Sequence, residues 1–190
     1  KVDEIARLRP DLVVGFSDIQ ADIAQALVKR GVEVWIANHR SVAGIVGYVR
    51  RLGAMVGAGT KAEEYADLLE ARVEAVRALA RAMPRRPKVY FEEWDAPCIS
   101  AIGWVSELVG IAGGEDIFPE KAACAMGRDR ILADPGEVIR RAPDVIIGSW
   151  CGKKFRPEKV AARPGWGAIP AVRDGELHEV KSPLILQPGP

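Results

Sequence analysis

Short apolar runs alternate along this chain with segments of helical periodicity, and this alternation predicts the order of its first elements. The predicted elements are a buried strand after Pro10, a helix over 19–30 that ends at Gly31, a second buried strand over 32–37, and a helix over 42–52 that Gly53 closes. Apolar strands that alternate with helices are typical of a parallel sheet with helical crossovers.

The longest predicted helix runs from Lys61 to Met83. This stretch contains neither Gly nor Pro, and its apolar residues recur with the period of one helix face. Thr60 followed by Glu63 has the spacing of a capping box, which predicts where the helix begins. At about 1.5 Å per residue the helix is roughly 34 Å long, enough to connect two lobes.

The second half of the chain repeats the alternation. It predicts a strand over 88–94, a helix over 104–112, a helix over 135–141 with Asp134 as its N-cap, a strand over 145–150, a helix over 157–162, a hairpin of 171–172 with 177–180, and a loop over 182–190. The whole pattern therefore indicates an α/β protein.

One twelve-residue phrase occurs twice. Residues 4–15 read EIARLRPDLVVG and residues 137–148 read EVIRRAPDVIIG, with Glu, Arg, Pro, Asp and Gly at the same places. Each copy predicts a short helix that ends before Pro and a buried strand that Gly closes. We therefore predict two Rossmann-like lobes with parallel sheets joined by one long helix. The predicted division is 1–59 for a partial amino-terminal lobe, 60–83 for the bridging helix and 84–190 for the carboxy-terminal lobe.

Composition and charge exclude several classes of partner. The chain has 190 residues, a net charge of +1, 48% hydrophobic and 28% charged residues, which is typical of a soluble globular protein. Without a basic stripe, neither nucleic acid nor a membrane surface is an expected partner. No apolar run approaches the ~18 residues that span a bilayer. Because the chain begins at Lys1 on a predicted helix, we interpret it as processed, trimmed or a fragment.

The three cysteines are widely spaced and form no CxxC motif. Cys98, Cys124 and Cys151 lack the spacing of a metal cluster, so no metal site is predicted. They are interpreted as buried or semi-buried free thiols; one disulfide with a leftover thiol is the alternative.

Three aromatic residues follow predicted strands. Ligands of parallel α/β sheets bind beyond the carboxyl ends of the strands, and Phe16, Trp94 and Trp150 lie at such ends. Flat aromatic walls suit a large planar or apolar ligand, so these residues are the predicted ligand contacts. The alternative is that each ring covers the core.

Charged side chains near the strand ends raise the question of catalysis. The carboxylates of Glu92, Glu93 and Asp95 suggest acid–base chemistry, but no nucleophile–His–Asp set accompanies them, and no catalytic residue is predicted. An enzyme remains the competing hypothesis. It requires His39, Glu93, Asp95 and Cys151 to converge on one pocket.

Glu4 and Glu137 occupy the same place in the two copies of the repeated phrase. Either alone would be read as a solvated helix carboxylate. As a matched pair, one on each lobe, they are what a two-fold symmetric partner with arginine pockets would engage.

At this point the sequence resembles a known family, the ABC-transporter substrate-binding proteins that capture cobalamin, haem and iron–siderophore complexes. The phrases that carry the resemblance are RPDLVVG, FEEWDAP, WVSELVGIAGGEDIF, EVIRRAPDVIIGSW and SPLILQPGP. They run through nearly the whole chain and are most similar to the cobalamin-binding branch.

The resemblance implies a function. A non-enzymatic, monomeric carrier in the periplasm or elsewhere outside the cytoplasm, either free or lipid-anchored, would hold a corrinoid, haem or ferric siderophore between its lobes against aromatics such as Phe16. It needs no cofactor. Glu4 and Glu137 would dock onto arginines of a dimeric membrane permease. A chelatase or nitrogenase-like enzyme on a similar fold is the alternative.

Two departures from the family pattern bear on the ligand. The strands that usually precede the start of this chain and the helix that usually follows PGP are not found, so the amino-terminal lobe is expected to be incomplete. Residues 183–187 (PLILQ) are mostly apolar, at a place where cobalamin-binding members can supply charged contacts.

Overall fold

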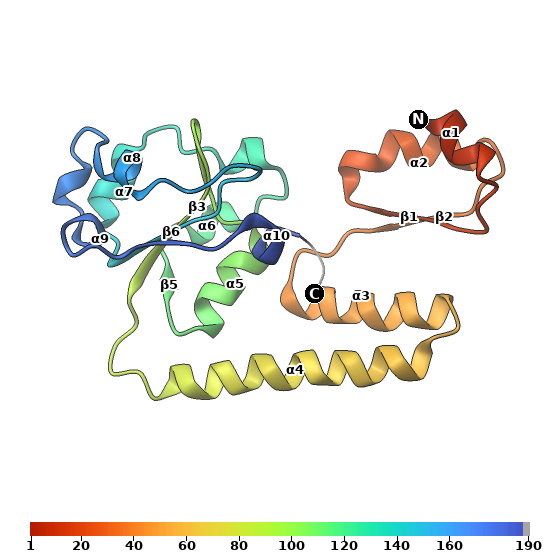
Figure 1. The fold of residues 1–190 in the computed structure, drawn as a ribbon, viewed down its shortest axis with the longest axis horizontal. Coiled ribbons are helices and arrows are strands. Elements are labelled where there is room, and N and C mark those ends of the chain that lie inside the picture. Colours follow the sequence, from red (N-terminus) through yellow and green to blue (C-terminus); the bar gives the residue numbers. More distant parts are fainter. Residues whose placement is uncertain (188–190) are drawn as a thin grey trace. The chain divides into compact units, whose positions relative to one another are not determined.

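The computed structural model describes residues 1–187 and divides into two compact units, an amino-terminal unit of Lys1–His39 and a carboxy-terminal unit of Arg40–Pro190. Each unit has a sheet of its own (Figure 1). The predicted α/β class with parallel strands is confirmed. The predicted lobes at 1–59 and 84–190, with 60–83 between them, stay a prediction.

The amino-terminal unit is a small parallel α/β motif. Its elements are α1 (Val2–Arg7), β1 (Val13–Phe16), the 3-10 turn η1 (Asp18–Gln20), α2 (Ala21–Val28) and β2 (Val34–Ala37). β1 and β2 pair in parallel, with Val13 opposite Val34 and Phe16 opposite Ala37. Their carboxyl ends therefore lie at one edge, where Phe16 is found.

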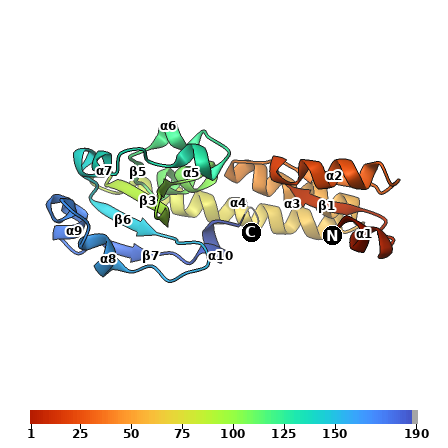
Figure 2. The same cartoon turned by 90° about the horizontal axis from the view of Figure 1, so that it is seen from above.

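The carboxy-terminal unit is built on a five-stranded sheet. Its strands are β3 (Lys88–Asp95), β4 (Cys98–Ser100), β5 (Glu115–Asp116), β6 (Val145–Gly148) and β7 (Leu177–Glu179). The order is β4-β3-β6-β7, and β5 pairs with the beginning of β3. All neighbours are parallel except β4, which folds back antiparallel on the end of β3. Figure 2 shows β6 and β7 side by side.

Helices and turns connect these strands. They are α3 (Val42–Met55), α4 (Gly59–Arg81), α5 (Gly103–Ile111), α6 (Pro119–Ala122), η2 (Gly127–Arg130), α7 (Gly136–Arg141), α8 (Pro157–Ala161), η3 (Trp166–Ala168), α9 (Pro170–Arg173) and α10 (Ser182–Ile185). The long predicted helix is confirmed as α4, which lies along α3 (Figure 1). Among the described residues no helix has the length and apolar character needed to cross a membrane.

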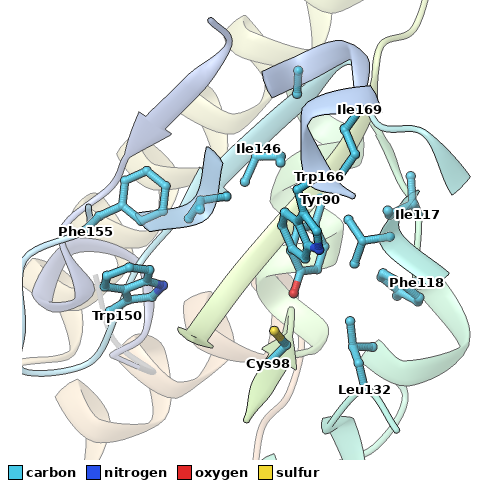
Figure 3. Close-up of a cluster of buried hydrophobic side chains, with 13 residues drawn as sticks. Tyr90, Cys98, Ile117, Phe118, Leu132, Ile146, Trp150, Phe155, Trp166 and Ile169 are labelled. Carbon is cyan, nitrogen blue, oxygen red and sulfur yellow. The ribbon is translucent and has the colours of Figure 1, made fainter. Parts of the chain in front are cut away.

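An aromatic core packs on one face of this sheet. Tyr90 of β3 is completely buried and contacts the ring edges of Phe118 and Trp166, with centroids 5.8 and 6.1 Å away (Figure 3). Side chains alternate along a strand, so Phe91 lies on the opposite face, where it lines an apolar hollow with residues of α4 and α5. Both faces of β3 are thus covered, as expected for a central parallel strand.

The repeated phrase folds in the same way in both units. Arg9 and Ala142, at the same place in the two copies, both adopt the left-handed conformation, with φ of 48° and 49°. Such a residue ends a helix, and here a proline follows it directly. The next strand begins with equivalent bonds too: Val13 N–H donates to the Glu33 carbonyl and Ile146 N–H to the Glu176 carbonyl, both at 2.9 Å. The two copies lie in separate sheets.

The glycine that closes each copy leaves room for a neighbouring side chain. A Cβ atom on Gly15 would lie 2.6 Å from Ile36 Cδ1, and one on Gly148 would lie 1.9 Å from the Phe155 ring. Neither glycine has a positive φ. Strand Gly at these places admits a neighbouring side chain.

Two predictions about helix ends were wrong. α3 continues through Gly53 to Met55, and α4 begins without a side-chain cap. Gly53 marks a helix contact instead of a helix end, since a Cβ atom there would lie 2.1 Å from Cβ of Ala62. Thr60 lies inside α4, whose N-cap is Ala58, so Thr60 and Glu63 form no capping box. The Glu63 carboxylate instead accepts a hydrogen bond from Arg50 of α3 at 2.7 Å.

The predicted hairpin of 171–172 with 177–180 was also wrong. Residues 170–173 form α9, and β7 pairs in parallel with β6. The loop predicted over 182–190 contains α10, while residues 188–190 lie outside the described part. The partner of β7 is β6, which is separated from it in the chain by α8 and α9, and a local pattern does not report such pairing.

The contact between α3 and α4 yields a test with a matched control. We expect Gly53→Ala to lower the free energy of unfolding by about 1–3 kcal/mol, because the added methyl group overpacks against Ala62. Gly47→Ala in the same helix meets only the flexible Arg51 side chain, so it should raise that free energy by up to ~1 kcal/mol. Urea unfolding followed by circular dichroism measures both, and equal stabilisation by the two changes would contradict the contact.

Candidate functional site

An open pocket lies at the carboxyl ends of β6 and β7. It has a volume of about 640 Å³ and is lined by Trp150, Gly152, Lys153, Lys154, Glu179, Val180, Lys181, Ser182 and Pro183. These residues come from the segment after β6 and the segment that joins β7 to α10. Strand ends of a parallel sheet are where ligands usually bind, so this strand-end pocket is the candidate site.

Trp94 lies beside this pocket at the end of β3. Its indole N–H donates to the Ala96 carbonyl at 2.9 Å, which fixes the ring. The Lys153 ammonium lies 4.0 Å from the Trp94 ring centroid and 5.3 Å from that of Trp150. Lys153 thereby connects the two predicted ligand contacts of this unit through cation–π interactions.

Lys153 is held in place by Asp95, with which it forms an ion pair. Burial alone would raise the pKa of Asp95, but the Lys153 hydrogen bond and nearby positive charge lower it overall. Asp95 is therefore ionised at neutral pH and neutralises Lys153.

Trp150 serves both the core and the pocket. Its side chain is only 3% exposed and its ring meets the edge of Phe155 at 5.1 Å. The indole N–H donates to the Glu92 carboxylate at 2.9 Å. Trp150 is thus a fixed part of the pocket wall, and its role in ligand contact stays a prediction.

Glu92 is a buried structural carboxylate. It is completely buried, and Arg163 binds it with two hydrogen bonds of 2.6 and 2.9 Å. Tyr90 donates its hydroxyl at 3.2 Å. Burial, together with the charge of Glu92, raises the pKa of Tyr90 well above its ordinary value, so Tyr90 stays a donor. Burial alone would lower the pKa of Arg163, but its bonds to Glu92 raise it overall.

Of the remaining catalytic candidates of this unit, Glu93 has a structural partner and Cys151 is an exposed free thiol. Glu93 pairs with Arg130, which is 2% exposed, at 2.6 and 3.1 Å. All three cysteines are free; Cys151 is exposed, and burial raises the pKa of Cys98 to about 11. Within residues 1–187, no group of three or more His, Cys, Asp or Glu side chains could hold a metal ion.

The sequence did not identify the basic side chains that pair with the carboxylates of the 92–95 segment. Arg130, Lys153 and Arg163 each neutralise one carboxylate of the 92–95 segment, yet they lie 37–71 residues away along the chain. Only Lys153 carried a signal, since it closely follows the predicted strand over 145–150.

In the amino-terminal unit, Phe16 and His39 lie at the ends of β1 and β2. Their ring centroids are 5.0 Å apart, and the two ring planes are tilted by 54°. The Phe16 N–H donates to Gln20 Oε1 at 2.7 Å. Ser17 follows with φ of 70°, a conformation that costs energy for any residue except Gly. The strand end that carries Phe16 is therefore closely defined by its own loop.

The two predicted docking carboxylates are both exposed. Glu4 and Glu137 lie in the first turns of α1 and α7, with side chains 74% and 41% exposed. They differ in their neighbours. Glu4 is 3.2 Å from the amino group of Lys1, whereas Glu137 accepts hydrogen bonds from Arg140 and Arg141. The Arg140 bond lowers the pKa of Glu137.

Comparison with known proteins adds to this geometry. The family model described as Periplasmic binding protein matches residues 1–184. The vitamin B12-binding protein of Vibrio parahaemolyticus serotype O3:K6 (strain RIMD 2210633) is 22% identical over 194 residues, which cover 100% of this chain and 67% of that protein.

Solved structures share the fold. The periplasmic heme-binding protein BhuT in complex with two hemes has a TM-score of 0.82 at 20% identity, over 100% of this chain and 73% of its own. The periplasmic vitamin B12-binding protein BtuF of Vibrio cholerae has a TM-score of 0.71 and 18% sequence identity, and the match covers 99% of this chain and 71% of BtuF. A possible iron-binding periplasmic protein of Staphylococcus epidermidis ATCC 12228 has a TM-score of 0.81 and 18% sequence identity, and the match covers 100% of this chain and 74% of that protein.

The buried ion pair yields a stability test. We expect Glu92→Gln to lower the free energy of unfolding by about 3–5 kcal/mol, because the Arg163 guanidinium loses its counter-charge in a largely buried site. Glu92→Gln combined with Arg163→Met should recover part of this loss, since no unpaired charge remains.

Asp174→Asn, which breaks an exposed pair with Arg173, is the control and should have no measurable effect. Urea unfolding compares the variants. A Glu92→Gln protein as stable as the control would show that the pair has no structural role.

Proposed function

We propose that this chain, which belongs to the periplasmic binding protein family, is the solute-binding component of an ABC importer. It binds a metal chelate of the corrinoid, haem or ferric-siderophore type and delivers it to a membrane permease. The match of the family model to residues 1–184 carries the proposal. The relatives named for vitamin B12 and heme support this ligand class.

The strand-end pocket supports a binding role for the carboxy-terminal unit. Its volume of about 640 Å³ is in the usual range for small-molecule sites. Trp94 offers a ring surface at the end of β3, and a flat chelate gains from stacking on such a ring. Trp150, whose side chain is 3% exposed, is the second proposed ligand contact and would act as part of the pocket wall. Phe16, at the strand end of the amino-terminal unit, is the third proposed ligand contact.

A transport role also fits the chemistry of the strand ends better than catalysis. The carboxylates of Glu92, Glu93 and Asp95 are each bound by an Arg or Lys side chain. A general acid or base needs a proton-transfer partner in the pocket, and these groups are already committed to structure. We therefore propose that the protein is not an enzyme and needs no cofactor.

The location and partners follow from the same proposal. A periplasmic binding protein works outside the cytoplasm, and its partner is an ABC permease. Attachment by a lipid anchor and a monomeric state stay predictions, as does the absence of a nucleic-acid partner.

A binding titration of the full-length gene product tests the ligand class. Cyanocobalamin, cobinamide, haemin and ferric siderophores are titrated and followed by absorbance, and we expect one of them to bind at micromolar concentration or below. Trp94→Ala should weaken that binding roughly 10-fold through lost stacking. Tyr65→Ala, which removes an exposed ring on α4, is the control and should change nothing. If none of these chelates binds, the proposal is wrong.

Docking to the permease has a separate test. Reversing both charges with Glu4→Lys and Glu137→Lys should reduce transport in reconstituted vesicles, because both carboxylates would lose their attraction to arginine. Ligand affinity should stay unchanged, since neither residue lines the strand-end pocket.

Glu64→Lys with Glu158→Lys makes the same change of charge at exposed sites elsewhere and serves as the control. Transport equal to that of the control would reject docking through Glu4 and Glu137.

A further inference from the structure

We infer that the strand-end pocket selects chelates that carry acidic groups, and that Lys154 and Lys181 bind those groups. The inference rests on the proposed function, because it takes the pocket as the ligand site. It narrows the ligand class by charge.

The pocket contains more lysines than its own carboxylates require. Lys153, Lys154 and Lys181 line it, together with the single carboxylate of Glu179. Asp95 neutralises Lys153. Glu179 has a structural contact as well, since it accepts the Phe155 N–H at 3.0 Å.

Two ammonium groups remain available. Within the described part of the chain, neither Lys154 nor Lys181 forms an ion pair. They come from different segments, the loop after β6 and the residue before α10, yet line the same pocket. Two long flexible cations on one pocket suit carboxylate or phosphate groups at the edge of a ligand.

The neighbouring surface explains what such a ligand would gain. Trp150 and Val180 give the pocket apolar walls, and Trp94 lies beside it under the Lys153 ammonium. A flat ring system with acidic substituents would place its apolar part on these walls and its acidic groups at Lys154 and Lys181. Charge-assisted hydrogen bonds formed next to an apolar wall are stronger than those in open water.

Lys153 has a different task from the other two lysines. Its ammonium is shared between Asp95 and the ring of Trp94, so an acidic ligand group would have to compete with Asp95. Lys153 therefore positions the Trp94 ring, whereas Lys154 and Lys181 determine specificity.

The test compares two porphyrins that differ only in their acidic groups. Haemin carries free propionates, and its dimethyl ester does not. With the full-length gene product, haemin should bind about 10-fold more tightly than the ester, and its affinity should fall as salt is added. Lys154→Gln with Lys181→Gln should remove this difference by weakening haemin alone. Lys61→Gln with Lys159→Gln, two exposed lysines outside the pocket, should leave it intact.

The outcomes separate this inference from the proposed function. Equal affinity for haemin and its ester, with no effect of the Lys154 and Lys181 changes, overturns the charge selection but leaves a metal-chelate carrier in place. Cobinamide has no acidic groups at the edge of its ring. If the wild type and the doubly changed protein both bind it tightly, the charge selection is likewise overturned and the metal-chelate carrier stays in place. If no porphyrin, corrinoid or ferric siderophore binds, both the inference and the proposed function fail.

Discussion

The ion pair of Glu92 and Arg163 is the interaction on which the carboxy-terminal unit depends. A carboxylate with no exposure is stable only when charge and hydrogen bonds replace its water, and Glu92 receives bonds from Arg163, Tyr90 and Trp150. These partners come from β3, from the residues after β6 and from the loop after α8. One buried charge therefore holds three distant segments of the chain together at the carboxyl end of the sheet.

The strand-end pocket is a consequence of that arrangement. Because its indole N–H is bound to Glu92, Trp150 is fixed with its ring in the core and part of its surface on the pocket. Two residues further along β3, the ring of Trp94 lies against Lys153, which forms an ion pair with Asp95. The pocket thus rests on rigid strands, while its outer lysines come from loops, an arrangement in which shape is fixed and charge is adjustable.

The repeated phrase shows how one local pattern can serve two surroundings. Its helix, left-handed residue, proline and strand recur with nearly the same backbone, because each of these features is set by neighbours within a few residues. The surroundings differ. Glu137 forms ion pairs with two arginines of its own helix and its side chain is 41% exposed. Glu4 lies near the amino group of Lys1 and its side chain is 74% exposed. Equivalent places in the sequence are therefore not equivalent in their electrostatics.

What the sequence determined by itself were the features set by near neighbours: the long helix α4, the strand cores of β1, β3 and β6, and the paired phrase, since periodicity, Pro and Gly act over a few residues. Tertiary structure alone decided that Gly53 lets α4 pack closely against α3 and that the Glu63 carboxylate binds Arg50. It also decided that β7 pairs with β6 instead of forming a hairpin. It also decided that Arg130 and Arg163 neutralise Glu93 and Glu92. Each of these depends on a contact between residues far apart in the chain, and the charge or size of a side chain does not reveal which distant partner folding will bring to it.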